Sequence, residues 1–169
     1  RAATAYQATL EYAKTGINLL GINGWVYDYE LTLELYNLAA ESASLLGEFA
    51  FLNNCIETIT LKANTALHQV NTYSIKIQSL ASQNKFQESI QTAKLILEKL
   101  GTFFPENPTP ENFFEGINEI RLLMGERKAE DLFHLPKMLD PEKLAVMNIA
   151  ASLIPTAFNA GSPLFPLLI

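Results

Sequence analysis

The segment NKFQESIQTAKLILEKLG (residues 84–101) decides the predicted fold, because residues 5–21, AYQATLEYAKTGINLLG, repeat its pattern. When Tyr6 is aligned with Phe86, apolar residues recur in both segments at steps of four, three, four and three. This spacing places one apolar stripe along an α-helix. The two stripes are Tyr6, Leu10, Ala13, Ile17 and Leu20, and Phe86, Ile90, Ala93, Leu97 and Leu100.

A fainter third copy begins at Phe49. Its stripe consists of Phe49, Leu52, Ile56, Ile59 and Ala63, and the three leading aromatic residues are 43 and 37 residues apart. An amphipathic helix and a tight turn are expected before the second and third copies, with the turns at LLGEF (residues 45–49) and SQNKF (residues 82–86). Gly21 and Gly101 follow the first and last stripes, as glycine often does where a helix ends.

A repeated helix–turn–helix unit predicts an array in which each hairpin buries its stripe against its neighbours. We therefore predict an all-α, TPR-like (tetratricopeptide-like) helical-hairpin solenoid of about seven or eight helices, packed as one continuous stack. Its period is longer than the usual length of about 34 residues. Residues 1–169 are interpreted as a single domain, with a repeat array at 1–101 and further helices at 109–169 after a proline-rich corner.

The second half carries two helix-start signals, Thr109–Pro110 and Asp140–Pro141. The second helix is expected to run to about Asn159 and to bend or end at Pro155. Its predicted core face is Leu144, Met147, Ala151, Ile154 and Phe158, widened by Ala145, Val146 and Ala150, which suggests burial on several sides. We considered the apolar tail as a membrane span, but asparagine, glycine and proline residues interrupt it.

The composition predicts a folded protein, since 49% of the 169 residues are hydrophobic and 18% are charged. A net charge of -6 argues against a nucleic-acid partner. A single cysteine, Cys55, is consistent with a reducing compartment, so we expect a cytoplasmic location. Both ends look cut, and we expect an excised piece of a longer protein whose apolar end, Leu164–Ile169, promotes pairing of two copies.

The sequence contains no catalytic, metal-binding or cofactor-binding motif. There is no HExxH, CxxC, GxxxxGK[ST] or GxGxxG, and His68 and His134 lie far apart in the sequence. Cys55 is expected to be a buried, inert thiol, because no His or Lys lies near it in the sequence. We therefore expect no catalytic, metal or cofactor site in this chain, with no cofactor required.

One row of polar residues is a candidate partner-binding surface. In TPR-type hairpins the first helix of each repeat lines the concave face, and polar residues at i, i+3 and i+7 share one helix face. The row comprises Glu34, Asn37, Glu41, Asn71, Ser74 and Gln78. The alternative, an ordinary hydrated helix face, stays open.

Three longer strings resemble a known family. GWVYDYELTLELYNLAAESASLLGEF, YSIKIQSLASQNKFQESIQTAKLILEKLGTFFPENP and NAGSPLFPLLI are similar to the TPR-like helical region of cyanobacterial-type multidomain hybrid signalling kinases. The markers are W-x-x-D-Y-E-L at Trp25–Leu31, L-G-x-F at Leu46–Phe49 and L-G-x-x-F-P at Leu100–Pro105. The resemblance implies a Ser/Thr protein kinase domain and an AAA-type ATPase domain before this region, and commonly a GAF domain and a histidine kinase module after it.

These observations lead to an expected function without catalysis in this chain. We expect a scaffold and protein-interaction segment of a signal-transduction kinase that couples an ATPase-type switch to sensor and kinase domains. The expected partners are neighbouring domains of the parent chain or a protein or peptide, with neither nucleic acid nor membrane. An independent peptide-binding TPR module and a small-molecule sensor remain as alternatives; a sensor would need an enclosed apolar pocket.

Overall fold

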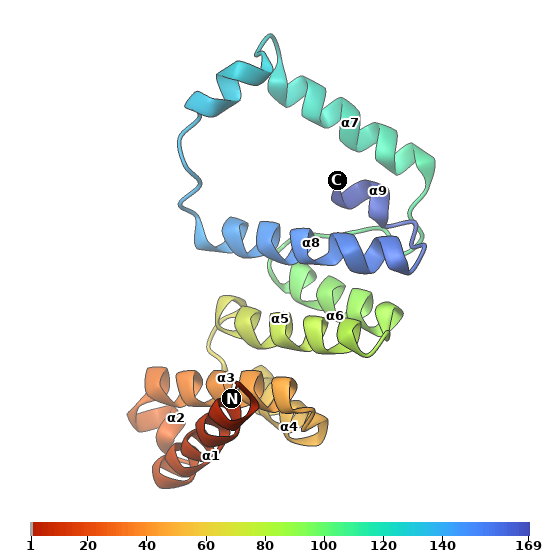
Figure 1. Cartoon of the computed structure of the whole chain (residues 1–169). Helices are drawn as coiled ribbons and strands as arrows, with labels where there is room; N and C mark the ends of the chain where they lie inside the picture. The colour runs from red at the N-terminus through yellow and green to blue at the C-terminus, as the bar shows by residue number, and fades with distance from the viewer. Residues whose placement is uncertain (1) are drawn as a thin grey trace.

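Helices are the regular secondary structure of residues 2–169, the part that this computed structural model describes, and no β-strand occurs there (Figure 1). The predicted all-α class is confirmed. The α-helices are α1 (Ala2–Leu20), α2 (Gly24–Tyr27), α3 (Tyr29–Leu46), α4 (Phe49–Lys62), α5 (Ala66–Ser82), α6 (Phe86–Lys99), α7 (Pro110–Met124), α8 (Pro141–Asn159) and α9 (Phe165–Leu168), and the 3₁₀ helix η1 spans Ala129–His134. The described residues thus hold nine α-helices, of which α2 and α9 are only four residues long.

Two helical hairpins, α3/α4 and α5/α6, form at the predicted turns. Gly47 ends α3 with φ +75°, and Asn84 follows α5 with φ +59°, which is a conformation that glycine and asparagine tolerate best. The N–H of Glu48 donates to the carbonyl of Ala43 at 2.8 Å, and the N–H of Lys85 donates to that of Leu80 at 2.9 Å. Both turns therefore satisfy the free carbonyl groups of the preceding helix in the same way.

The centres of the three predicted stripes are buried. Leu10 and Ala13 of α1, Leu52, Ile56 and Ile59 of α4, and Ile90, Ala93 and Leu97 of α6 all lie in the core. The leading aromatic residues are less buried than their stripes, since Tyr6 is 39% exposed and Phe49 is 38% exposed. The apolar spacing thus identified the packed face of each helix, whereas the first residue of each stripe lies at its edge.

The buried residues form two clusters rather than one continuous core. The first joins α1, α3 and α4 through residues such as Leu10, Ala40 and Ile56. The second joins α5, α6 and α8 through residues such as Ile77, Leu97 and Leu153. The helices α3, α5 and α8 still follow one another in Figure 1, and α5 contacts both α3 and α4. Ile75 of α5 packs against the first cluster, and side-chain hydrogen bonds also join α5 to α3 and α4.

The packed face of α8 differs from the predicted one. The helix begins after Asp140 and continues through Pro155 to Asn159, and its buried residues are Ala145, Ile149, Leu153, Thr156 and Ala157. The main predicted face is turned outward, since Leu144 is 39% exposed, Met147 60% and Phe158 67%, whereas Ala145 and Val146, two of the residues predicted to widen it, lie on the packed side. Because α8 is apolar on two opposite sides, periodicity could not choose between them. The buried side has the small residues that allow close approach to α5 and α6.

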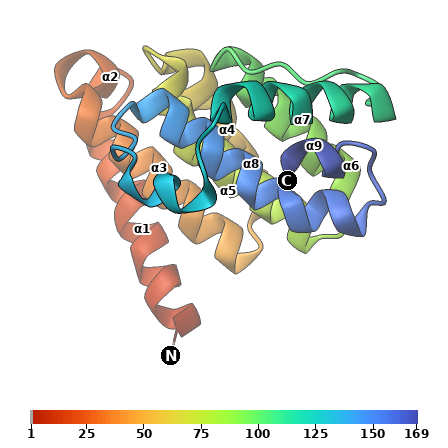
Figure 2. The same cartoon turned by 90° about the horizontal axis from the view of Figure 1, so that it is seen from above.

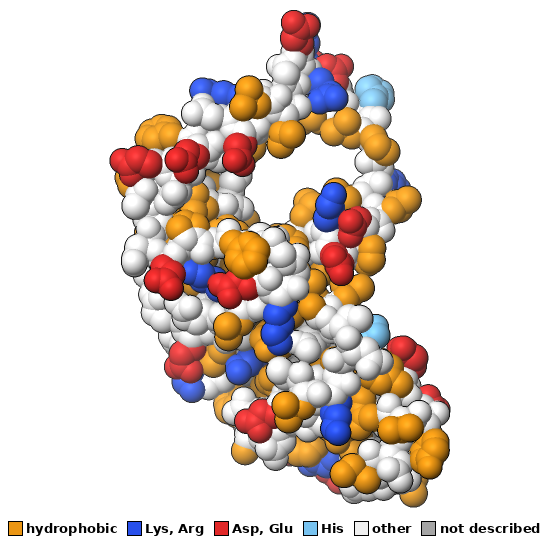
Figure 3. All heavy atoms as spheres, turned by 180° about the vertical axis from the view of Figure 1, so that it is seen from behind, with side chains coloured by type: hydrophobic (Ala, Val, Ile, Leu, Met, Phe, Trp, Pro, Cys, Tyr) orange, Lys and Arg blue, Asp and Glu red, His pale blue; other side chains and the backbone are white. Residues whose placement is uncertain are grey.

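Residues 109–140, which we call the strap, leave the body of the molecule and return to it. The Thr109 N–H donates to Asn112 Oδ1 at 3.1 Å where α7 begins, and Asp140 Oδ1 accepts from the Glu142 N–H at 2.9 Å where α8 begins, so both predicted caps are present. No residue of α7 is buried in the described structure. Seen from above, α7 and η1 lie on opposite sides of α8 (Figure 2). The space-filling view shows an open passage between the strap and the body (Figure 3).

Candidate functional site

The six predicted partner-binding residues lie on two neighbouring helices. Glu34, Asn37 and Glu41 belong to α3, and Asn71, Ser74 and Gln78 belong to α5, which contacts α3. Four of the six are exposed, whereas Asn37 and Ser74 are half-buried.

Two of these residues are engaged in structural hydrogen bonds. Asn37 Oδ1 accepts from the Thr72 hydroxyl at 2.6 Å, and the Ser74 hydroxyl donates to the Val70 carbonyl of its own helix at 2.9 Å. Glu34 and Glu41 remain the exposed carboxylates of the row. The structure places the row on one surface, and its role in partner binding stays a prediction.

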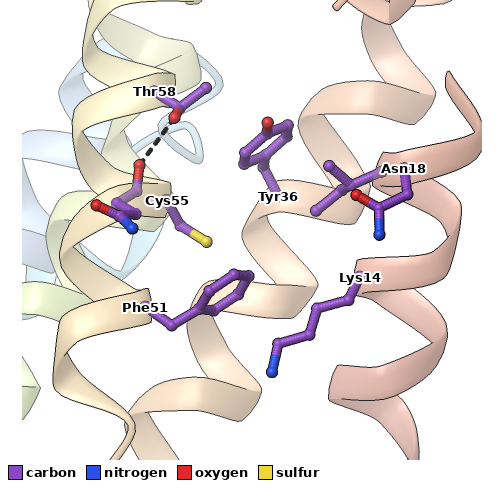
Figure 4. A pocket seen from close by; sticks show the side chains of 8 residues that line it. Lys14, Asn18, Tyr36, Phe51, Cys55 and Thr58 are labelled. Atoms are coloured by element: carbon purple, nitrogen blue, oxygen red, sulfur yellow. Dashed lines mark hydrogen bonds between the residues drawn. The ribbon is translucent and has the colours of Figure 1, made fainter. Parts of the chain in front are cut away.

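A pocket of about 270 Å³ opens between α1, α3 and α4 (Figure 4). It was not anticipated from the sequence, because its residues come from three helices. Its lining mixes apolar and polar side chains: Lys14, Ile17, Asn18, Tyr36, Phe51, Asn54, Cys55 and Thr58. In Figure 4 the labelled side chains of α1 and α4 face each other, with Tyr36 of α3 between them.

Lys14 lies at the edge of this pocket, where its ammonium group contacts two carboxylates and an aromatic ring. Its Nζ is 3.3 Å from Glu48 Oε2 and 3.5 Å from Glu11 Oε1, and it lies 4.7 Å from the centroid of the Phe51 ring. Two carboxylates therefore counter the single ammonium charge, and the pocket does not present a free cation to an anionic ligand. The pocket fits a small, uncharged molecule better than an anion.

Cys55 is buried in the pocket wall, as predicted. Burial raises the pKa of its thiol to about 12, and the ammonium of Lys14 counteracts only part of this effect. Lys14 is distant from Cys55 in the sequence, so no local pattern links the two residues. Burial also raises the pKa of Tyr36, with a further rise from Cys55 and a partial offset from the Thr58 hydroxyl. Neither group is prepared to ionise near neutral pH.

Hydrogen bonds connect the two hydrophobic clusters at what we call the polar junction: Tyr29, Asn37, Asn64, Gln69, His68, Thr72 and Lys99. The Asn64 N–H donates to the Tyr29 hydroxyl at 2.9 Å, and that hydroxyl lies 2.7 Å from His68 Nδ1.

The polar junction extends to α4 and α6 through Gln69. Its amide donates to the Thr60 carbonyl at 3.3 Å, and its carbonyl accepts from Lys99 Nζ at 2.6 Å. The partners are separated by up to 39 residues, so only the folded chain brings them together.

The motif W-x-x-D-Y-E-L builds one side of this junction. The Trp25 ring packs against Tyr29 at 5.7 Å and against Tyr36 at 5.2 Å. Asp28 caps α3, because its carboxylate accepts from the Leu31 N–H at 3.4 Å. The motif therefore orients Tyr29 toward His68, which is a structural role.

The described residues contain no group of three or more His, Cys, Asp or Glu side chains close enough to hold a metal ion. None of the helices that the structure describes combines the length and the apolar character needed to cross a bilayer. No protein-family model, curated protein or solved structure matches the chain. The fold and the geometry above are therefore the basis for the functional proposals.

Proposed function

We propose that this chain is a non-catalytic scaffold and protein-interaction segment. The observation that carries the proposal is the large number of exposed apolar side chains on regular helices, among them Leu122, Phe133, Met147 and Phe158, which are 60–88% exposed. Soluble proteins rarely expose continuous apolar surface unless something binds there. The pocket between α1, α3 and α4 has no acid–base pair arranged for catalysis, which favours binding over reaction.

The resemblance to hybrid signalling kinases supplies a context for this proposal. In that context the chain would couple an ATPase-type switch to sensor and kinase domains within one protein. Rigid-body motion of packed helices is one of the common ways in which a conformational change is transmitted. The two hydrophobic clusters, joined by Ile75 and by side-chain hydrogen bonds, are the units that would move in this proposal. The polar row on α3 and α5 offers acidic side chains to a basic partner, which is the independent peptide-binding version of the same proposal.

Affinity capture with the immobilised chain, followed by titration of each purified candidate, tests the proposal. We expect a saturable protein partner. If the partner uses the polar row, the Glu34→Lys, Glu41→Lys double variant weakens binding by roughly tenfold, because each reversal replaces an attraction by a repulsion. A chain for which no candidate gives a saturable titration contradicts the scaffold proposal, and an unchanged affinity in the double variant rejects the row.

A second candidate function is the sensing of a small uncharged molecule, favoured by the pocket that Phe51, Tyr36 and Asn18 line. A neutral aromatic compound could stack on Phe51 while the carboxamides of Asn18 and Asn54 bond its polar groups. We propose phenol and indole as probes in a thermal-shift titration. A saturable rise in melting temperature is expected, and Asn18→Trp, which fills the pocket, should abolish it.

The matched control for that experiment is Thr15→Trp, because Thr15 is exposed on the same helix and does not line the pocket. This variant should keep the full response. An equal loss in both variants, or no shift with either probe, rejects the sensor proposal.

A further inference from the structure

Helix α8 has two apolar sides, and only one of them is covered. The side with Ile149 and Leu153 packs into the second hydrophobic cluster. The opposite side, which we call the outer face, consists of Leu144, Met147, Ala151, Ile154 and Phe158. Phe158 contacts the ring of Phe165 at 5.5 Å, but it remains 67% exposed. The strap lies on the side of α8 away from α5 and α6 (Figure 1), so the outer face is turned toward the passage that Figure 3 shows.

The hairpin pattern of the fold indicates what kind of element fits beside the outer face. In the two preceding hairpins α3 is paired with α4 and α5 with α6, and both second helices are 14 residues long. The turn after α8 has the same bond as theirs, since the Ser162 N–H donates to the Ala157 carbonyl at 2.9 Å. The helix that follows it, α9, has four residues and contacts α7 as well as α8.

The charges around the passage define the occupant further. Residues 144–169 contain no Asp, Glu, Lys, Arg or His. The strap, in contrast, carries seven acidic and four basic residues. The uncharged outer face accepts an apolar stripe, because burial of an unpaired charge is costly. The net negative charge of the strap attracts basic residues on either side of that stripe. The same net negative charge of the strap repels anionic lipid headgroups, so a membrane surface does not fit this site.

The strap contributes apolar side chains as well. Leu123 of α7 is 77% exposed, Phe133 of η1 88% and Leu139 85%. Figure 3 shows hydrophobic side chains along the strap's edge of the passage, so a helix inserted between the strap and α8 would meet apolar groups on two sides. Such an arrangement gives a larger buried area than a flat surface would offer.

We propose that the passage between the strap and the outer face of α8 binds an amphipathic α-helix of a partner protein, about four turns long, with an uncharged apolar stripe and basic flanks. This inference rests on the proposed protein-interaction function and names the surface and the partner chemistry. The polar row on α3 and α5 plays no part in it.

The test uses a helical peptide that the chain itself supplies. A synthetic peptide of residues 84–101 has the stripe of a second hairpin helix, with three lysines and two glutamates. A second peptide carries Glu88→Gln and Glu98→Gln, which makes it more basic. A scrambled peptide of the same composition is the control. Binding to the whole chain is measured by fluorescence anisotropy at low and physiological salt.

We expect saturable binding of both stripe peptides, several-fold tighter for the more basic one at low salt, and none for the scrambled control. The Met147→Glu, Phe158→Glu double variant should weaken binding at least tenfold, because it places two charges on the outer face. These side chains are exposed, so the variant should fold. Leu61→Glu is the matched control: Leu61 is 82% exposed on α4 and should leave the affinity within twofold.

Three outcomes would overturn the inference. Wild-type dimers that the double variant dissociates, without peptide binding, would assign the passage to a second copy. A monomer that binds neither stripe peptide would indicate that the strap covers α8 by itself.

Peptide binding that Glu34→Lys, Glu41→Lys weakens and Met147→Glu, Phe158→Glu does not would move the partner to the polar row. This third outcome rejects the passage while the protein-interaction function stands. If neither the peptides nor any captured protein binds, both proposals fail together.

Discussion

Helices α6 and α7 look alike in the sequence and behave differently in the structure. They have 14 and 15 residues, and each has an apolar stripe and a glycine close after its last residue; the stripe of α7 is Phe113, Ile117, Ile120 and Met124. Yet α6 buries seven residues between α5 and α8, whereas α7 buries none and packs its stripe partly against α9. Local signals are sufficient to form a helix, but the neighbours in space decide how much that helix contributes to stability. The predictions below test this contrast between the packed helices and the strap.

Thiol reactivity should give the largest contrast. At neutral pH Cys55 should react with iodoacetamide about a thousandfold or more slowly than an exposed thiol, because its pKa of about 12 leaves very little thiolate. A Leu122→Cys variant in a Cys55→Ala background places the comparison thiol on α7, where Leu122 is 83% exposed. Mass spectrometry of timed samples measures both rates. Similar rates would mean that the first cluster opens readily.

The same raised pKa predicts a dependence of stability on pH. The folded state keeps the Cys55 proton to higher pH than the unfolded chain does, so the free energy of unfolding should fall as the pH rises above about 8.5. The fall attributable to this group is at most about 1.4 kcal/mol per pH unit and continues toward pH 12. The difference between wild type and Cys55→Ala in urea titrations isolates it. A constant difference across this range would contradict the burial of the thiol.

Truncation of one leucine in α6 and of one in α7 should change the free energy of unfolding by different amounts. Leu97→Ala in α6 removes a fully buried side chain and should lower the free energy of unfolding by about 2–5 kcal/mol. Leu123→Ala in α7 removes one that is 77% exposed, and should change it by less than about 0.5 kcal/mol. Urea denaturation followed by circular dichroism measures both. Equal losses would show that the strap is part of the cooperative core.

Amide hydrogen exchange should follow the same division. Amides in the centre of α6, around Ala93, are expected to exchange roughly a hundredfold or more slowly than those around Ile117 in α7, because little burial opposes the opening of α7. Mass spectrometry of peptides from the two helices reads this directly. If the stripe peptide binds in the passage, protection of α7 should rise toward that of α6, and its absence would argue against the proposed binding site.

The smallest effect concerns the glycines that follow the two helices. Gly101 has φ +80° and Gly125 has φ +57°, and no atom lies near the Cβ that a substitution would add at either position. Any loss of stability on substitution of these glycines is therefore due to backbone strain. Gly101→Ala should lower the free energy of unfolding by about 1–2 kcal/mol, whereas Gly125→Ala should distort the strap alone and leave global stability within about 0.5 kcal/mol. Thermal unfolding of both variants checks this, and a larger effect at Gly125 would reverse the comparison.

The sequence predicted those features that depend on neighbours along the chain. Helix starts at Pro110 and Pro141, the turns at Gly47 and Asn84, and the buried centres of the three stripes all follow from local chemistry. The prediction of which side of α8 is packed was wrong, because both sides are apolar and the choice depends on the shape of α5 and α6. Ala145, which was predicted to widen the core face, is on the packed side, and Ala157 there is a further small residue that a search for close packing could have used.

The candidate sites were predicted less well, because they depend on contacts between residues far apart in the sequence. The pocket needs Lys14 beside Cys55, and the polar junction needs Tyr29 beside His68. Side-chain bonds of this kind leave no periodic trace in the sequence. The row from Glu34 to Gln78 was placed on neighbouring helices as expected, but the structure also commits Asn37 to holding α3 and α5 together.

The bonds of Tyr29 with His68, of Gln69 with the Thr60 carbonyl and of Asn37 with Thr72 lie between the two hydrophobic clusters, beside the apolar contact that Ile75 makes. Water can replace each of these bonds at a net loss of only about 1 kcal/mol, whereas separation of two apolar cores would expose large nonpolar areas. Because α5 contacts α6 more extensively than it contacts α3 or α4, we expect bending of the stack to concentrate between α4 and α5. A load applied to either cluster should then turn that group of helices about its contact with the other.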